Sequence, residues 1–155
     1  MKNLTVPFHK QQTDYTCGPA SLRMVLEYFG RSVTEEELSP LLGTNDVMGT
    51  ERDRMSEIIK THELVPYERT DATLDDVKHL LSHAMPVIVR FLEQEQNSDH
   101  YGVVTGLNDT HITINDPWSG ANVIHEIGIF LMRWPCTYKN GQTCWMLGVG
   151  DRKLV

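Results

Sequence analysis

The feature of this sequence that most constrains its fold is a change of hydrophobic periodicity near residue 86. Before this point, apolar residues recur at the three- and four-residue spacing of amphipathic helices. After it, β-branched residues form short runs that are broken by turn residues, which is typical of strands. Helices followed by antiparallel strands favour an α+β fold over a parallel alternating one.

The boundaries of these elements follow from capping and turn signals. Four segments are expected to be helices: 19–29, 34–43, 51–62 and 73–83. Three runs are expected to be strands: 86–91, 101–106 and 111–114, the last two joined by a hairpin turn at 107–110. A short strand near 122–125, a helix over 126–134 and a strand near 144–149 complete the predicted order.

Length and charge limit the domain organisation and the partners. The chain has 155 residues, which suits a single domain over 1–155 with one sizeable core. Fourteen basic against twenty-one acidic residues give a net charge of -7, with no basic stripe, so neither nucleic acid nor an anionic membrane is an expected partner. No apolar run has the length of a signal peptide core or a membrane span, which predicts a cytoplasmic protein; the oligomeric state stays open.

The cysteine and histidine content argues against a disulfide framework and against a metal site. Cys136 and Cys144 are spaced to pair across a turn, but in a reducing cytoplasm both are expected to be small buried residues. His79 and His83 share one face of a predicted helix, yet no carboxylate or cysteine joins them in sequence. No metal and no cofactor is therefore expected.

Cys17 lies in different surroundings from the other cysteines. It precedes Gly18 and Pro19 at the start of the first predicted helix, and a helix N-terminus favours the thiolate form of a cysteine. Gly18 is expected to leave room for a substrate carbonyl. Gln11, six positions upstream, carries an amide that can donate to an oxyanion beside the Cys17 N–H. Taken alone, the position of Cys17 at a helix start favours a buried, inert cysteine, and its neighbours change this interpretation.

Two polar side chains, those of His100 and Asp116, are expected on neighbouring strands. His100 begins one predicted strand, and Asp116 ends the next. Because the start of one antiparallel strand faces the end of its neighbour, these side chains are expected to lie side by side.

The sequence closely resembles the papain-like family of bacteriocin-processing, double-glycine leader peptidases. Three segments carry this resemblance: Gln11 to Leu22, which contains Cys17-Gly18-Pro19-Ala20; the segment that opens with His100-Tyr101-Gly102; and the segment that ends with Asp116-Pro117. The resemblance is strongest to the free-standing branch without a transporter. It implies a papain-like fold in which N-terminal helices, the first opening with the nucleophile, pack on a C-terminal antiparallel sheet. It further implies Cys17 as nucleophile, His100 as base, Asp116 as orienter and Gln11 as oxyanion donor, with Gln12 as the fallback. Gly102 departs from the family pattern, which usually has a bulkier residue there, and is expected to loosen its strand.

These residues predict a cysteine hydrolase that cleaves a peptide, isopeptide or amide bond through a thioester, with a peptide or small amide as substrate. Two alternatives remain at this point. One is an acyl or γ-glutamyl transferase on the same fold, and the other is a catalytically silent peptide-binding module. The sequence does not fix the residues on either side of the scissile bond.

Overall fold

The computed structural model describes residues 3–93, 98–134 and 144–154. The helices are α1 (Cys17–Tyr28), α2 (Glu35–Leu41), the 3₁₀ helix η1 (Arg52–Arg54), α3 (Met55–Thr61), α4 (Leu74–Ser82) and α5 (Ile127–Arg133). The strands are β1 (Val65–Arg69), β2 (Val87–Leu92), β3 (Asp99–Leu107), β4 (His111–Asp116), β5 (Gly120–Glu126) and β6 (Met146–Gly150).

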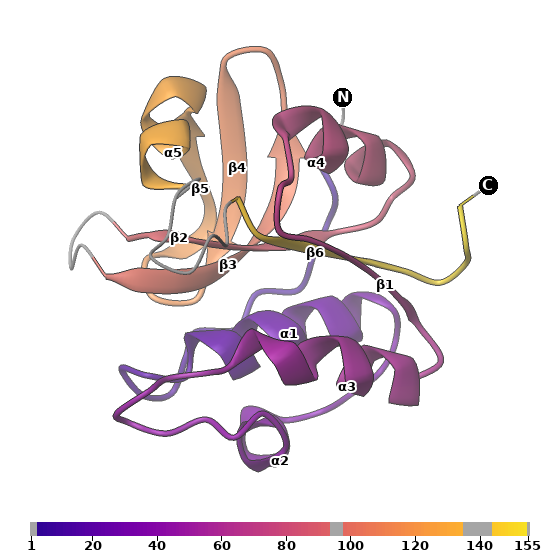
Figure 1. Ribbon diagram of the computed structural model, residues 1–155, viewed down its shortest axis with the longest axis vertical. Helices are drawn as coiled ribbons and strands as arrows, with labels where there is room; N and C mark the ends of the chain where they lie inside the picture. Colours follow the sequence, from indigo (N-terminus) through magenta and orange to yellow (C-terminus); the bar gives the residue numbers. More distant parts are fainter. Residues whose placement is uncertain (1–2, 94–97, 135–143, 155) are drawn as a thin grey trace.

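The strands form one antiparallel sheet in the order β1-β6-β2-β3-β4-β5. Helices α1, α2 and α3 lie on one side of this sheet, and α4 and α5 lie on the other (Figure 1). The α+β prediction, with N-terminal helices packed on a C-terminal antiparallel sheet, is therefore confirmed.

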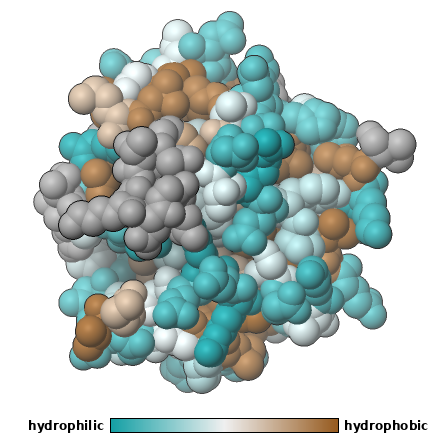
Figure 2. Space-filling view, in the orientation of Figure 1, coloured by the Kyte–Doolittle hydropathy of each residue, from teal (hydrophilic) through white to brown (hydrophobic). Residues whose placement is uncertain are grey.

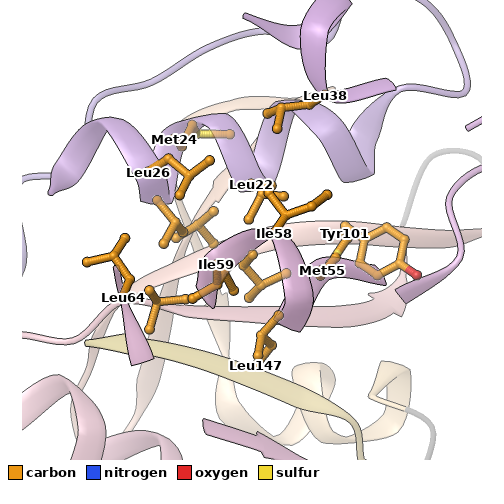
Figure 3. Close-up of a cluster of buried hydrophobic side chains, with 14 of the residues drawn as sticks. Leu22, Met24, Leu26, Leu38, Met55, Ile58, Ile59, Leu64, Tyr101 and Leu147 are labelled. Carbon is orange, nitrogen blue, oxygen red and sulfur yellow. The ribbon is translucent and has the colours of Figure 1, made fainter. Parts of the chain in front are cut away.

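Alternation along the central strands produces a separate apolar cluster on each side of the sheet. On β2, Ile88 packs into the cluster beneath α1–α3, whereas Val87 and Val89 pack into the cluster beneath α4 and α5. In the first cluster, leucine, isoleucine and methionine side chains from the three helices meet the ring of Tyr101 on β3 (Figure 3). This contact fixes α1 against β3, the two elements that carry the predicted nucleophile and base.

Side-chain capping explains where α2 and α4 begin. Thr73 and Asp76 form a complete capping box at the start of α4, as their spacing predicted. At α2, the Thr34 side chain accepts a hydrogen bond from the Glu37 N–H. The third predicted helix is split, because its first turn is the 3₁₀ helix η1 and α3 begins only at Met55.

Strand β1 is absent from the sequence prediction. Its run Val65–Arg69 contains Pro66 and shows no clear alternation of apolar and polar residues. The strand pairs with β6 at one edge of the sheet, and its last two residues are exposed. Tertiary pairing with β6, rather than a local signal, determines this strand.

The prediction that Cys144 is buried is confirmed, but the prediction that it is unpaired is wrong. Cys144 is disulfide-bonded, and Cys17 is the free cysteine among the described residues. Cys136 lies outside the described residues. The prediction of a free Cys144 rested on an assumed reducing compartment, which the sequence does not determine.

Gly102 tightens its strand rather than loosening it. A Cβ atom at this position would lie 2.8 Å from Cγ2 of Ile114 and 3.1 Å from Cε1 of Phe91. The space expected for a bulkier residue is therefore occupied by two neighbouring side chains. The departure from the family pattern is compensated by packing.

Apolar surface is also visible on the outside of the molecule. Brown surface gathers over α5 in Figure 2, where Ile129, Leu131 and Met132 are exposed, together with Ile124 on β5.

Among the described residues, none of the helices has the length and hydropathy that a membrane crossing requires.

A pair of glycine substitutions tests the packing at Gly102. Gly102→Ala is expected to lower the free energy of unfolding by about 1–3 kcal/mol, because the added Cβ would clash with the branched Ile114 side chain. Gly128→Ala in α5 is the matched control, since apart from its chain neighbours and the backbone of its own helix no described atom lies within 4 Å of its Cβ position. It is expected to raise stability by about 0.5–1 kcal/mol. Urea unfolding of both variants measures this, and a neutral Gly102→Ala would contradict the packing argument.

Candidate active site

Helix α1 presents Cys17 at its N-terminus. The helix begins at Cys17, with Thr16 as the N-cap, and eight of its residues are buried. The Cys17 thiol is free and half-buried. Gly18 does not leave open space for a substrate, contrary to the prediction, because a Cβ there would lie 2.5 Å from the Thr50 side chain. The glycine instead allows the loop that ends at Thr50 to pack against the start of α1.

Strands β3 and β4 bring His100 and Asp116 together. Nε2 of His100 lies 2.6 Å from Oδ1 of Asp116, and the two residues are only 6% and 2% exposed. The pairing of Val103 with Asn115, continued by one residue, sets Asp116 level with Gly102. His100 on β3 is therefore the diagonal neighbour of Asp116 on β4, and both lie on the same face of the sheet. Side chains can span the distance between diagonal neighbours.

The turn after β4 fixes the carboxylate. Oδ1 of Asp116 accepts hydrogen bonds from the Trp118 N–H at 2.8 Å and the Ser119 N–H at 3.1 Å, in addition to the His100 contact. Burial alone raises the pKa of this carboxyl, but the imidazole of His100 and the two backbone donors outweigh it and lower the pKa below its usual value. Asp116 is therefore a fixed anion at neutral pH.

The carboxylate in turn controls the charge of the base. Burial by itself lowers the pKa of His100, but the Asp116 carboxylate and the Cys17 side chain each favour the protonated ring and raise the pKa to about 9. At neutral pH His100 is therefore an imidazolium. Its Nε2 is committed to Asp116, which leaves Nδ1 as the ring nitrogen available to the Cys17 side chain.

Two aromatic residues restrict the imidazole and its strand. The Phe91 ring packs edge-on against His100 with 5.7 Å between centroids. The Tyr101 hydroxyl donates to the Thr50 carbonyl at 3.0 Å, and its ring packs against Trp145. Thr50 therefore contacts the residue after Cys17 and the residue after His100.

Gln11 is buried beside the same turn. It is 7% exposed, and its backbone N–H donates to the Pro117 carbonyl at 2.9 Å, directly after Asp116. Its side-chain Nε2 donates to the Thr13 carbonyl at 2.7 Å, while Oε1 is buried without a partner in the structure. Gln12, the fallback donor, has an exposed side chain. Burial favours Gln11 over Gln12, and its role as oxyanion donor stays a prediction.

Several groups that shape the site were not singled out from the sequence. Thr50 and Phe91 contact the catalytic candidates or their neighbours, and the buried carboxylate of Glu35 holds the Gln12 backbone. Glu35 lies in a run of three glutamates that is typical of a solvated helix start.

The rings of His79 and His83 pack edge-on with 4.7 Å between their centroids. No set of three or more metal-ligating side chains occurs in residues 3–93, 98–134 and 144–154.

The family of this chain follows from comparison with known sequences. Residues 3–141 match the sequence model of the Peptidase_C39 like family. The chain belongs to this family. This confirms the resemblance inferred from the residues around Cys17, His100 and Asp116.

Relatives and solved structures agree with this assignment. The chain is 31% identical over 111 residues to the lactococcin-A transport/processing ATP-binding protein LcnC of Lactococcus lactis, a match that covers 71% of this chain and 15% of LcnC. The peptidase domain of Streptococcus ComA superposes with a TM-score of 0.74 at 21% identity, over 96% of this chain and all of that domain. A protein from Bacillus anthracis described as a C39-like peptidase gives 0.77 at 16% identity, over 99% of this chain and all of that one. The papain-like fold is thereby confirmed.

The charge of His100 predicts how stability changes with pH. Because the folded-state pKa of about 9 lies above the ordinary 6.5, the imidazolium contributes stability that is fully present below pH 6.5 and is lost as pH rises through 9. The melting temperature of the wild type should therefore exceed that of His100→Gln most at pH 6.5. Between pH 6.5 and pH 9.5 this difference should shrink, and the corresponding difference in unfolding free energy should fall by on the order of 3 kcal/mol. Thermal unfolding across this range measures it, and a constant difference would contradict the assignment.

Proposed function

We propose that this protein is a cysteine hydrolase that cleaves a peptide, isopeptide or amide bond through a thioester intermediate. Cys17 is the nucleophile, His100 the general base and acid, Asp116 the group that orients His100, and Gln11 the oxyanion donor. The observation that carries the proposal is the buried 2.6 Å contact between His100 and Asp116, beside a free thiol at a helix N-terminus. Membership of a peptidase family supports it.

The proposal assigns a residue to each chemical step. The Cys17 thiolate, paired with the imidazolium, attacks the scissile carbonyl carbon and forms a tetrahedral oxyanion. The Cys17 N–H and the Gln11 amide then stabilise that oxyanion. His100 passes its proton to the leaving amine, the C–N bond breaks, and a thioester remains. The neutral His100 next takes a proton from water, which attacks the thioester and regenerates the thiolate.

Three expectations accompany this proposal. The span 1–155 acts as one domain, the substrate is a peptide or small amide without nucleic acid or membrane, and the protein works in the cytoplasm. The disulfide of Cys144 weighs against the last, because disulfides ordinarily persist in oxidising compartments. Alkylation of native cell extracts, followed by mass spectrometry of the peptide that contains Cys144, tests this. A reduced Cys144 supports a cytoplasmic location, and an oxidised one contradicts it.

The first test of function measures the reactivity of Cys17. Iodoacetamide should alkylate Cys17 in the folded protein near pH 7 about ten times faster than it alkylates free cysteine, because cysteines at a helix N-terminus and beside an imidazolium are generally more reactive nucleophiles. His100→Gln should slow this reaction at neutral pH.

A panel of peptide substrates that includes double-glycine sites then separates the alternatives. Hydrolysis supports the proposal, whereas product formed only with an added thiol or amine indicates a transferase, and binding without turnover indicates a silent module.

A pair of variants separates the orienting group from the oxyanion donor. Asp116→Asn should retain the fold and partial activity, because an asparagine still accepts the imidazole N–H but stabilises the imidazolium poorly. Gln11→Ala should reduce kcat by about 100- to 1000-fold with little change in KM, since the donor acts on charge that is present only in the transition state. Gln12→Ala is the matched control. If Gln12→Ala reduced kcat and Gln11→Ala did not, the donor would be assigned to the wrong glutamine.

A further inference from the structure

A buried carboxylate on α2 anchors the loop between Gln11 and Cys17. Glu35 is 2% exposed, although it belongs to the first turn of α2. Its two oxygens accept the Gln12 backbone N–H at 3.0 and 3.3 Å. The side chain of Thr16, the residue before Cys17, is near enough to this carboxylate to favour its charged form. Glu35 therefore holds the residue after the proposed oxyanion donor and lies beside the residue before the proposed nucleophile.

The same loop is held from the opposite side. The Gln11 N–H donates to the Pro117 carbonyl, in the turn that also fixes Asp116. Within the loop, the Thr16 hydroxyl accepts from the Thr13 N–H at 3.0 Å and from the Thr13 hydroxyl at 2.9 Å. Glu35 and Pro117 are thus two anchors, one from the helical side of the molecule and one from the sheet.

We infer that Glu35 is a positioning residue that aligns the Gln11 amide with the Cys17 N–H for stabilisation of the oxyanion. This inference rests on the proposed function. Glu35 touches neither the thiol nor the imidazole in any contact found among the described residues. It acts through the Gln12 backbone at one end of the loop and beside the Thr16 side chain at the other. A displacement of about 1 Å at an oxyanion donor is enough to lower the rate by up to about 100-fold, because such donors act only at short range.

The energetics distinguish this role from a structural one. Burial raises the pKa of Glu35, and its contacts with the Gln12 N–H, Thr16 and the nearby charge of Arg23 only partly oppose this, while Glu36 adds to it. A carboxyl whose folded-state pKa is raised makes the fold less stable as pH rises through that range. The charged form therefore costs stability at neutral pH. Removal of this charge is therefore not expected to lower the stability of the fold, which separates the proposed role from a purely structural one.

Two reactions of Cys17 test the inference without a known substrate. With 4-nitrophenyl acetate, the thiolate attacks the carbonyl carbon, passes through a tetrahedral oxyanion, and releases 4-nitrophenolate to leave an acetyl thioester. With iodoacetamide, the thiolate displaces iodide directly and no oxyanion forms. The ratio of the two rates therefore isolates oxyanion stabilisation from thiolate reactivity.

Glu35→Gln should lower the rate of acylation by about 10-fold, and Glu35→Ala should lower it further, because a weaker or absent acceptor frees the Gln12 N–H. Alkylation should stay within about 2-fold of the wild type, since that step makes no use of the loop donors. The melting temperature of Glu35→Gln at pH 7 should not fall below that of the wild type. Glu37→Gln, an exposed carboxylate on the same helix, is the matched control and should leave both rates unchanged.

Each other outcome has a defined meaning. Unchanged acylation in Glu35→Gln overturns the inference and leaves the proposed function intact. An equal loss of acylation, alkylation and melting temperature shows a structural role, and also overturns it. If the wild type is acylated no faster than Cys17→Ser, the proposed function fails, and the inference fails with it.

Discussion

The buried contact between Asp116 and His100 is the interaction on which the rest of the site depends. An imidazolium that is almost fully buried would be unstable without a compensating anion. Asp116 provides that anion because two backbone N–H groups of the following turn and the imidazole together hold it ionised. The position of the turn after β4 therefore determines the protonation of the proposed base.

Several separate parts of the fold serve this contact. Strand register sets His100 diagonal to Asp116, Phe91 limits the motion of the imidazole, and α1 is fixed to β3 by the apolar cluster that includes Tyr101. The loop that carries Gln11 is tied to the same turn through Pro117. The nucleophile comes from the helical side and the base from the sheet, so the two meet only when both apolar clusters are packed. Catalytic geometry is thus a consequence of the tertiary fold.

Periodicity and motif spacing predicted the main elements and the candidate residues because these depend on local sequence. The capping box at Thr73 and the hairpin turn after Leu107 were predicted for this reason, and the two strands it joins bring His100 to Asp116. Strand β1 was missed because Pro66 interrupts its pattern and pairing with β6 determines it. The role of Gly18 was misjudged because its neighbour Thr50 is far away in sequence. Glu35 was overlooked because burial of a charge is a tertiary property that a run of glutamates conceals.

The protonation state of His100 is the most direct test of this account. Nitrogen NMR of the imidazole ring, recorded as a function of pH, should show both nitrogens protonated at pH 7 and loss of one proton near pH 9. In Cys17→Ser the transition should move to lower pH, because the contribution of the Cys17 side chain to the pKa of His100 is removed. A neutral imidazole at pH 7 in the wild type, or a transition that Cys17→Ser leaves unchanged, would contradict the proposed arrangement of Cys17, His100 and Asp116.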